Sequence, residues 1–335
     1  MPVGFRTGRH EDPSRPNWDG DGPRPLNWCA WYPTSEDIGE TDFRFGPRQP
    51  WFDIGPVAHD APIVSNAPCP VVLLSHGTGG QALHLGWLAR RLAQRGFIAI
   101  GIDHHGNTLT KPYRAEGFLC WWERTRDLSV LLDHVIAGEF GAHVDANRIH
   151  VAGYSLGGCA AAGLMGAITE TSRFQRTATS RDYARGVPEF PDLADHLPGL
   201  LATSAIFRDS WDRMSIDYHD PRFKAALMLA PGRGLFGFNE ASLGRITAPT
   251  RIVVGGVDPT RAASEWLHKR LNGSGLDVLT PCIGHYVFLP EATEQGRKEN
   301  PAACLDAEGV DRRATHKHVA TEATRLFSQS RDNLL

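Results

Sequence analysis

The sequence predicts an α/β fold in which helices cover both faces of a doubly wound, mostly parallel sheet. From residue 71 onwards, short continuous apolar runs alternate with longer stretches of helical periodicity, which is the pattern of parallel strands connected by helices. The composition, with 41% hydrophobic and 22% charged residues, is that of an ordinary globular chain. Although 335 residues would allow two domains, the alternation indicates one large core.

The first 70 residues differ from the rest of the chain. They are rich in Pro, Gly, Asp and Trp and lack helical periodicity, so we expect irregular structure with some β-strand. Residues 28–33 (WCAWYP) are expected to form a strand that ends at Pro33, because proline cannot donate a backbone hydrogen bond to a neighbouring strand.

The predicted elements of the core begin at residue 71. Residues 71–74 are all apolar, as in a strand buried on both faces. Apolar positions between residues 85 and 92 have the i, i+3, i+4, i+7 spacing of a helix with one buried stripe. The same criteria predict further strands at 97–102, 148–152, 225–230 and 251–254, a short strand near 278–279, and helices at 128–136, 156–167 and 319–327.

The segment 166–216 interrupts this alternation between a helix and the next strand. It carries many charges, three prolines and several large apolar side chains. We interpret it as an inserted lid or cap segment, with residues 1–165 and 217–335 forming the single core domain. A helical excursion without a functional role is the alternative.

Residues 153–157 (GYSLG) match the pattern G-x-S-x-G between a predicted buried strand and a predicted helix of small residues. A serine on such a sharp strand-to-helix turn has crowded neighbours, which explains Gly153 and Gly157. The helix N-terminus also directs free N–H groups toward negative charge that forms at Ser155. The pattern therefore predicts Ser155 as a catalytic nucleophile.

A glycine-rich loop, residues 75–80 (SHGTGG), follows an earlier predicted strand. Gly77 and Gly79 would let the backbone approach a substrate carbonyl group closely. We predict an oxyanion hole formed by the backbone N–H groups of Thr78 and of Leu156, the residue after the nucleophile. A phosphate-binding P-loop is excluded because no Gly-Lys-Ser/Thr follows.

The base and the acid that activate a serine are expected later in the chain. Asp258 follows the predicted strand 251–254, at the sheet edge where open α/β folds bind ligands, and His285 follows the next short strand. We predict His285 as general base and general acid, and Asp258 as the carboxylate that orients its ring. Asp217 and Asp220 precede a strand and are expected at the opposite edge.

Other polar and aromatic residues are expected to be structural. Adjacent histidines in residues 103–105 (DHH) point in divergent directions, which suits a shared metal ion badly, so we predict a loop-shaping role and no metal site. His76 is expected to hold its loop by hydrogen bonds. Trp121 and Trp122 are expected to pack in the core, while the nine tryptophans leave room for an aromatic-lined acyl pocket.

These motifs together resemble the α/β-hydrolase superfamily, and more closely the bacterial predicted dienelactone hydrolases and platelet-activating-factor acetylhydrolase-like serine esterases. The resemblance rests on residues 3–6, 24–26, 31–33, 75–80, 103–108, 153–158, 258 and 284–285. It implies an α/β-hydrolase fold and esterase chemistry. Dienelactone hydrolases use a cysteine nucleophile, whereas position 155 is serine. In related acetylhydrolases the acid can follow an earlier strand, but here that strand ends at 229–231 (LAP) without a carboxylate, which favours Asp258.

Charge and cysteine content limit the partners and the location. The net charge of −3 provides no field that would attract nucleic acid, and no apolar run is long enough to span a bilayer. The N-terminus has no apolar leader segment, so we expect a cytoplasmic protein. The six cysteines form no C-x-x-C pair, and we expect buried free thiols, with a disulfide at Cys282 or Cys304 left open.

The sequence therefore predicts a serine carboxylic-ester hydrolase that acts on small to medium acyl esters through an acyl-enzyme, without a metal ion or organic cofactor. The same residues would also serve an amide, lactam or lactone hydrolase, and the sequence does not separate these. A non-catalytic binding protein with this fold is the alternative from another class. The physiological substrate and the oligomeric state are not predicted.

Overall fold

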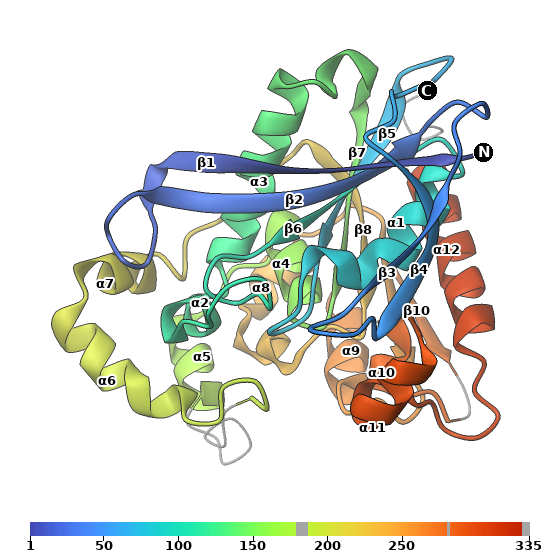
Figure 1. The fold of residues 1–335 in the computed structure, drawn as a ribbon. Coiled ribbons are helices and arrows are strands. Elements are labelled where there is room, and N and C mark those ends of the chain that lie inside the picture. The colour runs from blue at the N-terminus through green and yellow to red at the C-terminus, as the bar shows by residue number, and fades with distance from the viewer. Residues whose placement is uncertain (179–186, 280–281, 330–335) are drawn as a thin grey trace.

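The computed structural model describes residues 1–178, 187–279 and 282–329. Its centre is a sheet with the strand order β10-β9-β8-β7-β5-β6-β2-β1-β4-β11, and β3 pairs with β4 (Figure 1). The strands are β1 Val3–Pro16, β2 Pro23–Pro33, β3 Thr41–Phe45, β4 Phe52–His59, β5 Cys69–Ser75, β6 Ile98–Asp103, β7 Val144–Tyr154, β8 Phe223–Leu229, β9 Thr250–Gly255, β10 Ser274–Leu279 and β11 Glu291–Ala292. The six strands from β10 to β6 all pair in parallel, which confirms the predicted mostly parallel sheet.

Helices connect the strands from β5 onwards, and further helices follow the last strand, β11. The α-helices are α1 Gly86–Ala93, α2 Ala115–Leu119, α3 Glu123–Ala137, α4 Leu156–Leu164, α5 Thr171–Ala178, α6 Leu193–Thr203, α7 Ala205–Asp212, α8 Glu240–Gly244, α9 Arg261–His268, α10 Glu294–Glu299, α11 Pro301–Cys304 and α12 Arg312–Gln329. Short 3₁₀ turns are η1 Ala82–Leu85, η2 Gly141–His143, η3 Arg233–Gly237 and η4 His285–Phe288. The helices and strands predicted after residue 71 are all present, with ends that differ by a few residues.

The core has two layers because the central strands are apolar on both faces. In β5, Val71 and Leu73 belong to one buried cluster, whereas Val72 and Leu74 belong to the other. Helices α3, α4 and α9 supply the first cluster, and α1 and α12 supply the second, so they lie on opposite faces of the sheet (Figure 1). Burial of apolar surface on both faces, at about 25 cal/mol per Å², accounts for the continuous apolar runs in the sequence.

The first 70 residues are more regular than the sequence predicted. They contain four strands, and β1 and β2 form a long antiparallel hairpin whose second strand pairs with β6. The expected strand at 28–33 is the end of β2. Between Arg6 and Glu11, β1 is mostly polar and alternates between partly buried and exposed positions, so no apolar run marks it in the sequence.

The segment 166–216 carries α5, α6 and α7 and packs against the core around Trp122. The indole N–H of Trp122 donates to the backbone oxygen of Ser210 over 2.9 Å, and its ring contacts the rings of Phe174 and Trp211. Trp122 is therefore a buried packing residue, as expected, and it joins the segment 166–216 to the start of α3.

Candidate active site

Three side chains that lie far apart in the sequence meet at the carboxyl edge of the sheet. The Nε2 atom of His285 lies 3.1 Å from the hydroxyl oxygen of Ser155, and its Nδ1 atom lies 2.9 Å from a carboxylate oxygen of Asp258. Ser155 directly follows β7, Asp258 follows β9, and His285 begins the turn η4. The three predicted residues therefore form one hydrogen-bonded chain in the order that a serine nucleophile requires.

The backbone at Ser155 is held in a conformation that few residues adopt. Its φ angle is +53°, and it is the N-cap of α4. A Cβ atom at position 153 would lie 2.0 Å from the oxygen of Gly157, and one at position 157 would lie 2.0 Å from the oxygen of Ser75. Both flanking glycines are therefore required by the close approach of backbone, and the turn presents the serine side chain at the end of β7.

Asp258 is held by the turn that follows β9. Its Oδ1 atom accepts hydrogen bonds from the N–H and the hydroxyl of Thr260 at 2.7 and 2.8 Å, and its side chain is fully buried. These bonds leave Oδ2 facing the His285 ring. The rival carboxylate of Asp220 instead accepts from Arg222 and Ser129, and it precedes β8, at the opposite end of the parallel strands.

The backbone of His285 is bound by Tyr154, the residue that precedes Ser155. The hydroxyl of Tyr154 donates to the backbone oxygen of His285 over 3.2 Å, and the two rings lie 5.0 Å apart. The pKa of Tyr154 is raised well above its usual value because the phenol is buried, so it stays a donor at neutral pH. One short segment thus places both the hydroxyl at Ser155 and the backbone that carries the imidazole.

The glycine-rich loop after β5, residues 75–80, lies directly against Ser155. A Cβ atom at Gly77 would lie 3.3 Å from Cβ of Ser155. Within the described residues, the backbone N–H groups of Thr78 and Leu156 donate to no other group, whereas the N–H of Gly79 is already used. The two N–H groups predicted for the oxyanion hole are thus available for a ligand.

Two polar side chains for which the sequence predicted no role at the site, Asn107 and Arg124, fix this loop. The Oδ1 atom of Asn107 accepts the N–H of Gly79 at 2.6 Å. The buried guanidinium of Arg124 donates to the backbone oxygen of His76 at 2.6 Å and lies 3.4 Å from that of Gly77. These contacts hold the loop carbonyl groups away from the site and so leave the Thr78 N–H free. No distinct signal in the sequence marks Arg124, because it lies among the charged and polar residues 123–127 (ERTRD) at the start of α3.

His76 is a loop residue rather than a base. Its Nδ1 atom donates to the backbone oxygen of Gly77 at 2.6 Å, and its Nε2 atom accepts the N–H of His104. Burial, together with the nearby Arg124 charge, lowers the pKa of His76 well below its usual value, so the ring is neutral. His76 therefore ties β5 to β6, in line with the structural role expected for it.

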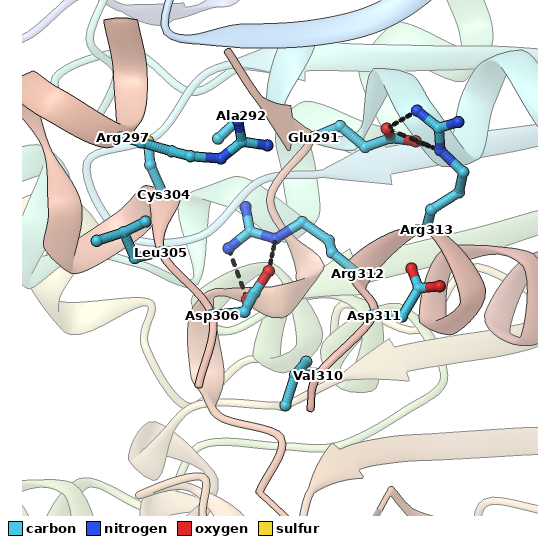
Figure 2. A pocket seen from close by; sticks show the side chains of 10 residues that line it. All are labelled: Glu291, Ala292, Arg297, Cys304, Leu305, Asp306, Val310, Asp311, Arg312 and Arg313. Carbon is cyan, nitrogen blue, oxygen red and sulfur yellow. Dashed lines mark hydrogen bonds and ion pairs between the residues drawn. The ribbon is translucent and has the colours of Figure 1, made fainter. Parts of the chain in front are cut away.

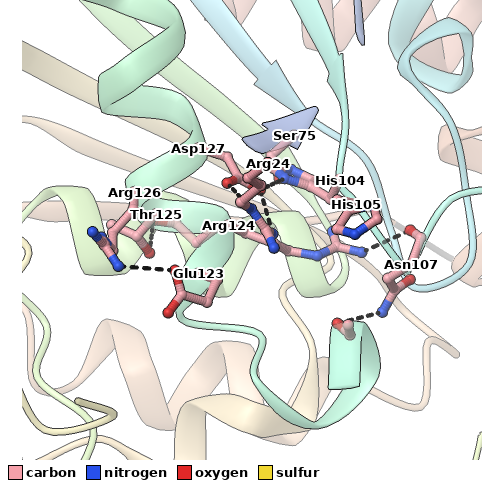
Figure 3. A network of polar contacts seen from close by, with 12 residues as sticks. Arg24, Ser75, His104, His105, Asn107, Glu123, Arg124, Thr125, Arg126 and Asp127 are labelled. Atoms are coloured by element: carbon pink, nitrogen blue, oxygen red, sulfur yellow. Dashed lines mark hydrogen bonds and ion pairs between the residues drawn. The ribbon is translucent and has the colours of Figure 1, made fainter. Parts of the chain in front are cut away.

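A second Ser–His–Asp chain lies inside the core, and the sequence analysis did not anticipate it (Figure 3). The hydroxyl of Ser75 lies 2.8 Å from Nε2 of His104, and Nδ1 of His104 lies 3.0 Å from Asp127. Ser75 and Asp127 are 0% exposed and His104 is 1% exposed. Burial lowers the pKa of His104 to about 3. Because no substrate can reach Ser75, we assign this chain a structural role.

Buried ion pairs explain why this second chain is fixed. Burial alone would raise the pKa of Asp127, but the guanidinium groups of Arg24 and Arg15 hold it well below its usual value. Arg24 binds both carboxylate oxygens of Asp127, at 2.7 and 3.0 Å. Since Arg15 and Arg24 come from the β1–β2 hairpin and Asp127 from α3, these pairs fasten the N-terminal hairpin to the core.

Residues 103–105 shape the loop after β6, as expected. Asp103 accepts from the N–H of Ala82 and from the hydroxyl of Thr110, and His105 accepts the N–H of Trp18. In the parts of the chain that the structure describes, no group of three or more His, Cys, Asp or Glu side chains is placed to hold a metal ion.

A cavity of about 480 Å³ is lined by residues between Glu291 and Arg313 and by none of the three residues Ser155, Asp258 and His285 (Figure 2). Its lining contains no aromatic residue, and two of its arginines are already paired, Arg312 with Asp306 and Arg313 with Glu291. It is therefore not the aromatic-lined acyl pocket for which the tryptophan content left room. Trp121 and Trp122 are each 1% exposed and belong to the core.

All six cysteines, each within the described residues, are free thiols. Four are buried, whereas Cys282 is exposed and Cys29 is partly exposed, so the disulfide left open at Cys282 or Cys304 is not formed. None of the helices in the described ranges combines the length and the hydrophobicity that crossing a lipid bilayer requires.

Comparisons with known proteins support the observed fold. The chain has the α/β-hydrolase fold predicted from its sequence, with a Ser–His–Asp arrangement at the carboxyl edge of the sheet. Residues 66–181 match the family model described as serine aminopeptidase, S33. A ferulic acid esterase from Streptomyces cinnamoneus has a TM-score of 0.62 at 19% identity, covering 98% of this chain and 90% of that one.

Other known proteins are similar over a shorter stretch of sequence or have a lower structural similarity. A cutinase of Thermobifida alba, Est2, is 32% identical over 90 residues, which is 26% of this chain and 27% of the cutinase. The chain therefore matches only about a quarter of the length of its curated relatives. A dienelactone hydrolase from Anabaena variabilis has a TM-score of 0.44 at 16% identity, covering 91% of this chain and 92% of that one.

Proposed function

We propose that the protein is a serine hydrolase of carboxylic esters that acts through an acyl-enzyme. The observation that carries this proposal is the chain from Ser155 through His285 to Asp258, with hydrogen-bond distances of 3.1 and 2.9 Å. In the proposed reaction, His285 takes the proton of Ser155 as the serine attacks the ester carbonyl carbon. His285 then protonates the leaving alcohol, and Asp258 stabilises the imidazolium ion.

The oxyanion of the tetrahedral intermediate would be held by the N–H groups of Thr78 and Leu156. Within the described residues, neither N–H group donates a hydrogen bond to another group of the protein. Leu156 is the first residue of α4, and the positive N-terminal end of this helix favours negative charge. A water molecule, activated by His285, would then attack the acyl-enzyme and release the acid. In this series of steps, residues of the chain carry out each proton transfer and supply each hydrogen-bond donor to the oxyanion.

An ester substrate is favoured by the local similarity to cutinases. Small to medium acyl esters are the substrate class that we propose. Amide hydrolysis is the second candidate, because the family model that matches residues 66–181 is described as a serine aminopeptidase. The two reactions differ in the leaving group that His285 must protonate.

Two experiments test this proposal. Labelling of the folded protein with a fluorophosphonate probe, followed by peptide mapping, should place the label on Ser155; a folded protein that takes no label would favour a non-catalytic binding protein. Hydrolysis of p-nitrophenyl butyrate should exceed hydrolysis of the matched p-nitroanilide of butyrate. A faster reaction with the anilide would replace the ester proposal by the amide one.

A further inference from the structure

The carboxylate side chain of Glu189, in the segment 166–216, lies beside the glycine-rich loop 75–80, which we call the oxyanion loop because it contains Thr78. A Cβ atom at Gly79 would lie 2.6 Å from Cγ and 3.1 Å from Cβ of Glu189. The side chain of Glu189 therefore rests on the backbone of the residue after Thr78. Gly79 itself has a φ angle of +60°, and this close approach gives a second reason for a glycine there.

The position of Glu189 is fixed by a short turn. The N–H of Phe190 donates to the backbone oxygen of Val187 over 2.9 Å, and Pro188, between them, restricts the backbone of the turn. The ring of Phe190 contacts the ring of Phe118 in α2 at 5.3 Å. Glu189 thus projects from an anchored turn rather than from a loose loop, which places its side chain beside Gly79.

The Glu189 side chain lies beside a tyrosine, because a Cβ atom at Gly79 would lie 2.9 Å from the Tyr113 hydroxyl as well as 2.6 Å from Cγ of Glu189. Its charge acts on the His285 ring and on the phenols of Tyr113, Tyr154 and Tyr286. Two of these phenols are already committed, since Tyr113 donates to the backbone oxygen of Gly79 and Tyr154 to that of His285. Partial burial raises the pKa of Glu189, which reflects its separation from bulk water.

Among the described residues, no side chain forms an ion pair or a hydrogen bond with the Glu189 carboxylate. An unpaired negative charge close to an oxyanion hole opposes the negative charge that develops in the transition state. A cationic group on the substrate would remove that opposition, and a carboxylate beside a tyrosine side chain is a suitable environment for an ammonium group.

We propose that Glu189 is a specificity-determining residue that selects esters carrying a positively charged group. This inference rests on the proposed esterase function and assigns a substrate class to the same site. The inserted segment then contributes directly to substrate recognition, because Glu189 is its contact with the oxyanion loop. An anionic ester is expected to be a poor substrate for the same reason.

The test compares esters that differ in charge but hardly in shape. One pair differs in the acyl group: the p-nitrophenyl esters of 4-(trimethylammonio)butanoate and of 5,5-dimethylhexanoate. The other pair differs in the alcohol: the butyrate esters of 2-(trimethylammonio)ethanol and of 3,3-dimethylbutanol. The wild-type protein should prefer the cationic member of at least one pair by tenfold or more in kcat/KM, and Glu189→Gln should reduce that preference to less than threefold.

The neutral esters serve as the internal comparison, because loss of the opposing Glu189 charge in Glu189→Gln should raise their kcat/KM or leave it unchanged, whereas it should lower kcat/KM for the cationic esters. Asp195→Asn removes one negative charge from the exposed surface of α6 and should leave the preference intact. The proposal is overturned if the wild-type protein prefers neither cationic ester, if the preference survives Glu189→Gln, or if Glu189→Gln slows all esters equally. Ser155-dependent hydrolysis of the neutral esters in those cases would leave the proposed function standing.

Discussion

At the scale of single residues, the proposed mechanism depends on which nitrogen of His285 carries the proton. The carboxylate of Asp258 lies 2.9 Å from Nδ1, so Nδ1–H donates to it and Nε2 is left as the acceptor that faces Ser155. Thr260 supplies two further hydrogen bonds to Asp258 and so keeps the carboxylate in place. In the proposed mechanism the tautomer of His285, rather than proximity alone, would make Ser155 a nucleophile.

Replacing Asp258 with asparagine tests this dependence. Thr260 can still donate to the amide oxygen, but the amide NH₂ then faces Nδ1 and forces the proton onto Nε2, where it blocks acceptance from Ser155. We expect kcat for p-nitrophenyl butyrate to fall by about 10⁴-fold at pH 7 with KM nearly unchanged. Steady-state kinetics on the folded variant would check this. A decrease of less than tenfold would show that Asp258 does not orient the ring.

At the scale of elements, the loop between β5 and α1 is shaped by residues from other segments. Asn107 comes from the loop after β6 and Arg124 from α3, and both bind backbone groups next to Thr78. The N–H of Thr78 can face a substrate only if the neighbouring backbone N–H and C=O groups, those of Gly79 and His76, form their hydrogen bonds with other segments. The availability of an oxyanion donor is thus a property of three elements together.

Asn107→Ala should remove part of this support. The N–H of Gly79 would lose its partner, and the loop would no longer hold Thr78 in one position. Because loss of one oxyanion donor costs on the order of 10²–10³ in rate, we expect kcat to fall between about 10- and 100-fold with KM within threefold. Asn239→Ala, which removes a comparable bond to the N–H of Ser242, is the matched control and should leave kcat within twofold. Equal kinetics in the two variants would contradict this role.

The site could be predicted from the sequence where short motifs carry it. The glycines around Ser155 and the positions of Asp258 and His285 after strands follow from local geometry and strand order. Asn107, Arg124 and Glu189 could not be found in that way, because they act through contacts with segments distant in sequence. The β1 strand was not recognised because its polar residues are paired with β2 rather than buried, so no apolar period marks it.

At the scale of the whole molecule, several buried histidines are kept neutral by the fold. His150 is fully buried in β7, its ring is stacked on that of Phe327 at 4.8 Å, and neither ring nitrogen has a hydrogen-bond partner among the described residues. Burial lowers its pKa to about 3, whereas the pKa in the unfolded chain is near 6.5. As the pH falls below about 6.5, the unfolded chain binds a proton that the folded chain rejects, so stability is lost.

His150→Leu should therefore reduce the acid sensitivity of the fold. The free energy of unfolding of the wild-type protein should fall between pH 7 and pH 5, and about 2 kcal/mol of that fall is expected from His150 alone. Urea unfolding of both proteins at the two pH values measures the difference. If both proteins lose the same free energy, His150 does not titrate in the way that its burial requires.

The described part of the molecule contains two Ser–His–Asp chains. The most direct test of the proposed function is therefore to compare Ser155→Ala with Ser75→Ala in the hydrolysis of p-nitrophenyl butyrate. Ser155 lies at the sheet edge, partly exposed beside two free N–H groups, whereas Ser75 is buried in the core. We expect kcat/KM to fall by roughly 10⁶-fold in Ser155→Ala and by less than tenfold in Ser75→Ala, with both variants folded in thermal unfolding. Activity within tenfold of the wild-type protein in Ser155→Ala would contradict the account.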